Sequence, residues 1–156
     1  MMDKIIRVSG FIIDENNLIY LQRRGKFNYE KSPLNQIYEL ESYPGLLQAT
    51  VAGSVEEGES PIEALWRELR EELSLYPHQL EIQAEEYLGG MYCVRLSLVN
   101  AFIHELRLHP GSGGIETFFH PDQIVVKPQR GKYVSFYDLN AMFEDELEVL
   151  KRFWKK

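Results

Sequence analysis

The sequence predicts an α+β layered sandwich, and three observations lead to this fold class. Short apolar segments bounded by turn residues are mixed along the chain with two segments of helical periodicity. These strand-like and helix-like segments do not alternate one by one, as a parallel βαβ sheet would require. No repeat, low-complexity tract or Pro/Ser-rich linker interrupts the 156 residues, so we expect a single domain over residues 1–156.

The chain begins with a predicted β-hairpin. Its strands are residues 5–13 and 18–22, and Asn16-Asn17 is the turn signal between them. An aromatic-rich connection over residues 25–45 follows. Connections of this length in compact domains are usually functional or mobile, and this one could stack on a base or close as a lid.

The remaining segments supply further strands and both helices. The predicted strands span residues 46–52, 81–88, 91–103 and 133–137, the predicted helices span residues 61–73 and 139–154, and residues 110–114 are a predicted loop. The apolar side of the last helix fits the core or a dimer contact. Its end, Phe153-Trp154, could supply the surface of a homodimer.

Composition and charge exclude several classes of function. The chain is 44% hydrophobic and 26% charged, which is typical of a globular protein. Its net charge of −7 argues against nucleic-acid binding, because such proteins need a basic surface to displace counterions. A phosphorylated small molecule remains compatible with this charge if arginine, lysine or bound metal ions offset the repulsion.

The sequence also predicts where the protein resides. Cys93 is its one cysteine, so no disulfide framework is expected and a reducing compartment is favoured. The first 14 residues include the charged residues Asp3, Lys4 and Arg7 and lack the pattern of a signal peptide. No apolar run approaches the roughly 20 residues that span a bilayer. We therefore expect a cytoplasmic protein with no membrane association.

The helix over residues 61–73 has a strongly marked start. Ser60 is the expected N-cap, Pro61 suits the first helical position, and Glu63 completes a capping box. An apolar stripe follows on one side of the helix, formed by Ile62, Leu65, Leu69 and Leu73.

The second half of this helix carries Glu68, Glu71 and Glu72 beside the apolar stripe. Acidic side chains are unfavourable there, because the macrodipole is negative at a helix C-terminus and like charges at i,i+4 repel each other. A solvated charged face is one interpretation. The other is that a divalent cation holds partly shielded carboxylates together, and an all-oxygen donor set indicates Mg²⁺ or Mn²⁺.

The segment GSVEEGESPIEALWRELREELSL, residues 53–75, resembles the Nudix box, G-x5-E-x7-R-E-U-x-E-E-x-G-U, in which U is aliphatic. The matching positions are Gly53, Glu59, Arg67, Glu68, Leu69, Glu71, Glu72 and Leu75. One position departs, because Ser74 stands in place of the second glycine. A serine there costs about 1 kcal/mol if the backbone is left-handed, and otherwise the helix continues toward Pro77.

This resemblance implies the Nudix fold, an α/β/α sandwich around a mixed β-sheet, and a metal-dependent hydrolase of diphosphate linkages. Glu68 and Glu72 would be the principal metal ligands, with Glu71 ligating or orienting and a backbone carbonyl near Gly53 contributing. Glu59 and Arg67 would brace the loop against the helix as an ion pair. The substrate would be a small molecule of nucleoside-diphosphate type or a related compound, attacked by a metal-activated water.

The resemblance leaves the general base and the phosphate contacts open. Glu116 is one candidate base, because relatives recruit a glutamate from a later loop, and Glu71 and Glu68 are the others. Arg23 and Arg24 could bind substrate phosphates, since guanidinium groups pair with them in a bidentate manner. A surface role for these arginines and for Glu116 is the alternative.

Two rival functions also follow from the family resemblance. The stretch YPGLLQATVAGSVEEGES resembles the subgroup related to isopentenyl diphosphate isomerase. Such an isomerase needs a cysteine and a histidine around the box glycine, where this sequence has Ala52 and Ser54. The second rival is a non-catalytic nucleotide-binding module, although such modules usually lose box carboxylates that are all present here.

Overall fold

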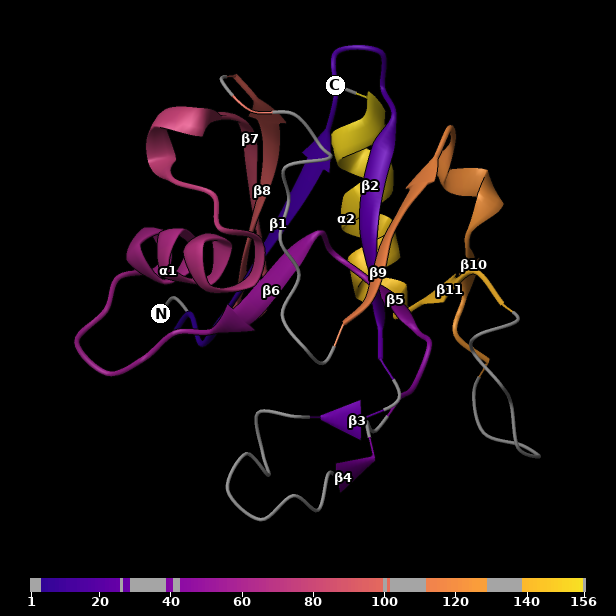
Figure 1. Cartoon of the computed structure of the whole chain (residues 1–156), viewed down its shortest axis with the longest axis horizontal. Helices are drawn as coiled ribbons and strands as arrows, with labels where there is room; N and C mark the ends of the chain where they lie inside the picture. The colour runs from indigo at the N-terminus through magenta and orange to yellow at the C-terminus, as the bar shows by residue number, and fades with distance from the viewer. Residues whose placement is uncertain are drawn as a thin grey trace.

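A computed structural model describes residues 4–25, 27–28, 39–40, 43–99, 101, 112–128 and 139–155 (Figure 1). Its elements, in chain order, are β1 (Arg7–Ile13), β2 (Ile19–Arg24), β3 (Phe27–Asn28), β4 (Glu39–Leu40), β5 (Leu47–Gln48), β6 (Val51–Ser54), α1 (Pro61–Leu73), η1 (Pro77–Gln79), β7 (Leu80–Leu88), β8 (Met91–Leu98), β9 (Ser112–Phe118), η3 (Pro121–Gln123), β10 (Val125–Val126), β11 (Ala141–Met142) and α2 (Glu144–Lys155).

The main sheet is mixed. Strand β1 is parallel to β8, and the other pairs of this sheet are antiparallel. One end of β1 pairs with β2, and its other end pairs with β6. Strand β5 pairs with β2, so residues 47–54, which form β5 and β6, lie between β1 and β2. The Thr50 hydroxyl bridges the two strands, since it accepts a hydrogen bond from Ile12 N at 2.9 Å and donates to the Tyr20 carbonyl.

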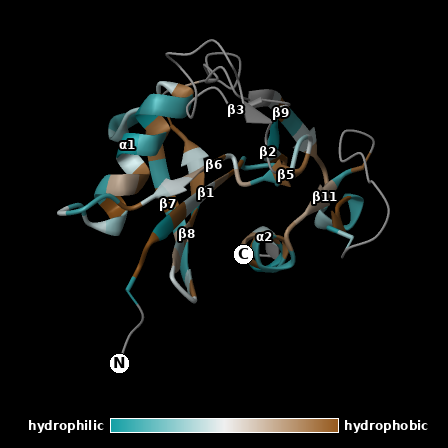
Figure 2. Cartoon of the chain, turned by 90° about the horizontal axis from the view of Figure 1, so that it is seen from below, coloured by the Kyte–Doolittle hydropathy of each residue, from teal (hydrophilic) through white to brown (hydrophobic). Residues whose placement is uncertain are grey.

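The two helices cover opposite faces of the sheet (Figure 2). The α1 side chains Leu65, Leu69 and Leu73 share one buried cluster with Val8 and Val94 of the sheet. A second buried cluster, on the other face, contains the α2 side chains Leu147, Leu150 and Phe153 together with Phe11 and Leu21. Because successive side chains of β1 point to opposite faces of the sheet, this strand contributes residues to both clusters. The predicted α/β/α sandwich around a mixed sheet is therefore confirmed.

Helix α1 has the bounds and the N-terminal cap that the sequence predicts. Glu63 N donates to the Ser60 hydroxyl at 3.2 Å, and Ser60 N donates to the Glu63 carboxylate at 3.3 Å. At the other end, Ser74 adopts a left-handed conformation with φ 56°, and Leu75 N donates to Leu69 O at 3.2 Å. The helix therefore ends at Leu73, and a serine occupies a position that favours glycine.

Several predicted boundaries are wrong. The strand predicted over residues 91–103 ends at Leu98 as β8. The strand over residues 46–52 is divided into β5 and β6 where Thr50 turns into the space between β1 and β2. The loop over residues 110–114 overlaps β9, which begins at Ser112 and pairs with β2. The last helix starts at Glu144 rather than at residue 139, because Ala141–Met142 pair with β10 as β11. The strand predicted over residues 133–137 lies outside the described residues.

Candidate active site on helix α1

Glycine at position 53 makes room for the Glu68 side chain. Strand β6 lies against α1, and a Cβ atom built on Gly53 would stand 2.1 Å from Cδ and 2.2 Å from Oε1 of Glu68. Real Cβ atoms do not approach a neighbour that closely, so any other residue would displace the carboxylate. Gly53 does not have a positive φ, and its role is therefore the close approach rather than backbone conformation.

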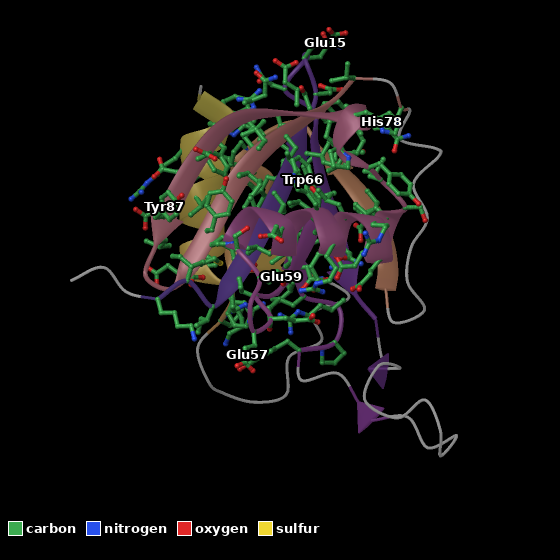
Figure 3. The ribbon with its side chains drawn as sticks, turned by 90° about the vertical axis from the view of Figure 1, so that its left-hand side faces the viewer. Glu15, Glu57, Glu59, Trp66, His78 and Tyr87 are labelled. Carbon is green, nitrogen blue, oxygen red and sulfur yellow. The ribbon has the colours of Figure 1, made fainter. Side chains whose placement is uncertain are left out.

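Arg67 binds the other groups around this carboxylate. Its Nε and Nη2 donate to the two oxygens of Glu59 at 2.8 and 3.0 Å, a bidentate pair, and Nη2 also donates to Ser54 O at 2.8 Å. Its Nη1 donates to Glu68 at 2.8 Å and to Glu71 at 3.2 Å. Figure 3 shows Glu59 close beneath α1. Arg67 thus joins the loop, strand β6 and the helix.

The charges of this network are stabilised by one another. Hydrogen bonds from Arg67, and from the backbone N–H of Glu56, hold the pKa of Glu59 at about 2, well below the usual carboxyl range. Hydrogen bonds to the carboxylates of Glu59 and Glu68 raise the pKa of Arg67 above its ordinary value. Both groups are therefore ionised at neutral pH.

The three box carboxylates differ in exposure. Glu72 is 8% exposed, and its Oε2 lies 3.4 Å from Ala52 N, while the Glu68 side chain is 13% exposed. Glu71 is more open, with 53% of its side chain exposed. The interpretation of a simple solvated face is therefore wrong for Glu68 and Glu72. These two carboxylates are shielded between the helix and β6.

This donor set fits an oxygen-preferring divalent ion. The three carboxylates lie on adjacent turns of α1, next to strand β6. Gly53 has no side chain to cover the backbone of β6 at this point, so backbone and carboxylate oxygens can face the same ion. Over the described ranges, however, no three acidic, histidine or cysteine side chains already surround a common point. Arg67 instead holds Glu68 and Glu71 as ion pairs.

Glu116 and Arg23 form a separate pair on the other face of the sheet. Glu116 is in β9, directly opposite Leu21, whose side chain belongs to the cluster under α2. The prediction that Glu116 lies in a loop is therefore wrong. Arg23 is 6% exposed, and its guanidinium binds the Glu116 carboxylate, with Nη2 at 2.9 Å from Oε1. It also donates to the carbonyls of Gly45 and Leu139, at 2.7 and 3.0 Å.

Arg24 lies in an aromatic environment. Its guanidinium carbon is 5.7 Å from the ring centre of Tyr43 and 5.6 Å from that of Phe143, and its Nε donates to Gln48 at 3.2 Å. The structure therefore does not bring Arg23, Arg24 and Glu116 into the α1 network. Their predicted roles toward substrate stay predictions.

Glu146 is a buried acidic residue, 6% exposed, that the sequence motif does not include. Its spacing from the apolar residues of α2 could have identified it from the sequence. Glu146 precedes Leu150 by four residues and Phe153 by seven, so it falls on the apolar stripe of α2.

Comparisons with known proteins agree with this geometry. A family model described as the NUDIX domain matches residues 3–137. No curated protein sequence matches the chain significantly.

Solved structures with the same fold are distant in sequence. They include DR0079 from Deinococcus radiodurans, with 21% identity, a TM-score of 0.58, and coverage of 94% of this chain and 80% of that one. A NUDIX hydrolase from Nitrosomonas europaea has 16% identity, a TM-score of 0.59, and coverage of 99% and 73%. A C. elegans Ap4A hydrolase has 14% identity, a TM-score of 0.57, and coverage of 94% of each chain. The chain therefore belongs to the Nudix family of pyrophosphohydrolases.

Proposed function

We propose that the protein hydrolyses a diphosphate linkage in a small-molecule substrate of nucleoside-diphosphate type, with Mg²⁺ or Mn²⁺ as its cofactor. One observation carries the proposal: two shielded carboxylates, Glu68 and Glu72, lie between α1 and a strand that has glycine at the point of contact. Burying such charges is unfavourable unless cations offset them. Arg67 does so for Glu68, and a divalent ion between the two carboxylates would do so for both. The Glu59–Arg67 ion pair fixes the loop before the helix and supports the same role.

Each carboxylate has a distinct part in this proposal. Glu68 and Glu72 would hold the divalent ion, Glu71 would ligate or orient, and a backbone carbonyl near Gly53 would complete the oxygen donors. When bound, the ion lowers the pKa of a water molecule and neutralises charge on the diphosphate oxygens. Arg67 positions Glu68 through its 2.8 Å hydrogen bond, and its pair with Glu59 keeps the guanidinium in place.

For the general base we favour Glu71 over Glu68 and Glu116. Glu71 is open to solvent water, whereas Glu68 is shielded and Glu116 is bound to a buried arginine. Pairing with arginine weakens a carboxylate as a base, and Glu71 accepts one hydrogen bond from Arg67 at 3.2 Å, whereas Glu116 accepts hydrogen bonds from two nitrogens of Arg23. We propose that Arg24 contacts a substrate phosphate and that Arg23, which is bound to Glu116, positions that carboxylate.

The rival functions receive less support from the structure. Cys93 is buried in β8, and burial raises the pKa of its thiol to about 12, so it does not supply the reactive cysteine of an isomerase. All box carboxylates are present, which argues against a module that only binds nucleotides. Among the described residues, no helix is long and apolar enough to span a membrane. A cytoplasmic location, the absence of nucleic-acid binding and a homodimer stay predictions.

Hydrolysis assays with Mg²⁺ and with Mn²⁺ test the proposal. The substrates are nucleoside triphosphates, nucleotide sugars, prenyl diphosphates and Ap4A, which is included because an Ap4A hydrolase shares the fold. We expect product from at least one class, and a loss of about 100-fold or more in Glu72→Gln. Glu57→Gln is the matched control, because this exposed acid lies at the outer end of the same loop (Figure 3). Equal turnover by wild type and Glu72→Gln would refute the enzymatic role.

A further inference from the structure

Thr50 is a fully buried polar residue in the chain between β5 and β6. Its hydroxyl lies between β1 and β2, where it accepts a hydrogen bond from Ile12 N at 2.9 Å and donates one to the Tyr20 carbonyl. Ile12 and Tyr20 are themselves partners in the β1–β2 ladder. One side chain therefore binds the amide of one strand and the carbonyl of the strand paired with it.

This hydroxyl marks the point at which β1 changes its neighbour. On one side of that point β1 pairs with β2, and on the other side residues 7–10 pair with β6. Strand β6 begins at Val51, directly after Thr50, and Val51 pairs with Gly10. Only one peptide bond separates the anchored residue from the first paired residue of β6, so the anchor limits where β6 lies along β1.

The register of β6 places two glycines at close contacts. Val51 lies opposite Gly10, where a Cβ atom would stand 2.8 Å from Cγ1 of Val51 and 3.2 Å from Cδ1 of Leu65 in α1. Gly53, two residues further along β6, leaves the room that Glu68 occupies. A slip of one residue turns every side chain of a strand to the other face. It would bring a residue with a side chain under the Glu68 carboxylate.

Three successive residues of β6 each meet a different charged side chain of α1. In chain order, the contacts are Ala52 with Glu72, Gly53 with Glu68, and Ser54 with Arg67. The first is a distance of 3.4 Å between amide and carboxylate, and the last is a hydrogen bond of 2.8 Å to the carbonyl. A shift of the β6 backbone would therefore change all three contacts together.

We propose that Thr50 is a positioning residue of the metal site, because its hydroxyl holds β6 in the register on which the positions of Glu68 and Glu72 depend. The inference rests on the proposed function, since it names a residue that acts on the site of the same enzyme. Thr50 contacts neither the ion nor the substrate, and it acts through β6.

The hydroxyl is the part of Thr50 that this role requires. Serine keeps a donor and an acceptor at the same position, whereas valine has the shape of threonine and neither group. Valine would leave the Ile12 amide and the Tyr20 carbonyl without this partner inside the sheet. Thr50→Val should therefore release β6 from its anchor, and Thr50→Ser should keep it in place.

Mn²⁺ binding and amide hydrogen exchange test the proposal without hydrolysis. Mn²⁺ is titrated into the full-length protein, and the free ion is measured by electron paramagnetic resonance. We expect Kd to rise tenfold or more in Thr50→Val and to stay within threefold of wild type in Thr50→Ser. In the metal-free protein, the amides of β6 should exchange at least tenfold faster in Thr50→Val and within threefold of the wild-type rate in Thr50→Ser.

Val149→Ala is the control for a general loss of stability. Val149 is fully buried in the cluster under α2, on the face of the sheet opposite α1, so this change removes core packing without touching β6. At a temperature at which every variant is folded, it should leave the Kd for Mn²⁺ within twofold. If Thr50→Val does not fold, Thr50→Cys takes its place with an expected increase in Kd of threefold or more, because a thiol is a weak hydrogen-bonding group.

Three results would overturn the proposal. They are a wild-type Kd in Thr50→Val, equal increases in Kd in Thr50→Val and Val149→Ala, and equal increases in Thr50→Val and Thr50→Ser.

The test separates this inference from the proposed function. Mn²⁺ binding that is weakened by both Glu72→Gln and Thr50→Val, in a protein that hydrolyses none of the substrates, would contradict only the proposed function. Hydrolysis that is lost in Glu72→Gln, together with wild-type Mn²⁺ binding and turnover in Thr50→Val, would contradict only the role of Thr50.

Discussion

Replacing Gly53 with alanine should greatly reduce the activity of this protein and reduce its stability only a little. The new Cβ would stand 2.1 Å from Cδ of Glu68, whereas such atoms normally stay about 3.4 Å or more apart. The Glu68 carboxylate must therefore move by more than about 1 Å. Displacements of this size in catalytic geometry cost on the order of 100-fold in rate, and we expect that loss in kcat/KM.

The effect on folding should be much smaller. Glu68 is a flexible side chain that can rotate away from the new Cβ, at the cost of the 2.8 Å hydrogen bond that it accepts from Arg67. Losing a hydrogen bond between charged groups costs about 1.5–3 kcal/mol when it is buried, and this pair is partly exposed. Alanine also stabilises the folded protein by about 0.5–1 kcal/mol, because it lowers the conformational entropy of the unfolded chain. The net loss should be about 2 kcal/mol or less, measured by urea unfolding.

A double-mutant cycle shows whether the effect acts through Glu68. If it does, Gly53→Ala combined with Glu68→Gln should be no less active than Glu68→Gln alone, because the carboxylate is already lost. Wild-type turnover by Gly53→Ala, or losses that multiply in the double variant, would refute the reasoning.

Three further predictions concern other parts of the fold. Ser74→Gly should raise the free energy of unfolding by about 1 kcal/mol, because serine has φ 56° there; urea midpoints check this, and an unchanged midpoint contradicts it. Arg67→Lys should lower both Tm and turnover, because lysine cannot make the bidentate pair with Glu59. Thermal melts and kinetic assays test this prediction. The control is Arg70→Lys, on the exposed side of the same helix. Burial raises the pKa of Glu146 from 4.5 to about 7, so its stabilising contribution is complete below pH 4.5 and is lost as the pH rises through 7. At about 1.4 kcal/mol per pH unit, the free energy of unfolding should fall by about 3 kcal/mol. Urea unfolding at pH 5 and pH 8 measures this decrease, and Glu146→Gln should abolish it. The same pH dependence in both proteins would contradict the assignment.

Much of the candidate site could be predicted because it is local in sequence. The spacing of Glu68, Glu71 and Glu72 fixes their common side of α1 through helix geometry alone, and Ser60 and Glu63 fix where that helix begins. The structure has the helix and its capping box at those residues. The fold class followed from the same kind of information, since periodicity and the order of segments already indicate which elements need a shared core.

Contacts between distant segments could not be predicted in this way. Arg23 binds Glu116 across 93 residues of chain, and strand pairing alone decides that this pair lies on the α2 face. The start of α2 was misplaced because β10 takes up Ala141 as a strand partner. The burial of Glu146 likewise depends on the walls that β1 and the β7–β8 turn add to its cavity.

Local sequence thus determined the acidic helix, its cap, the family motif and the number of layers, because short-range hydrogen bonding and side-chain periodicity act within a few residues. Tertiary structure decided that Gly53 leaves room for Glu68, that Arg67 also donates to the Ser54 carbonyl, and that Glu146 faces a cavity. These contacts arise only when strands and helices far apart in the chain pack against one another, and packing depends on the summed burial of all of them rather than on any one segment.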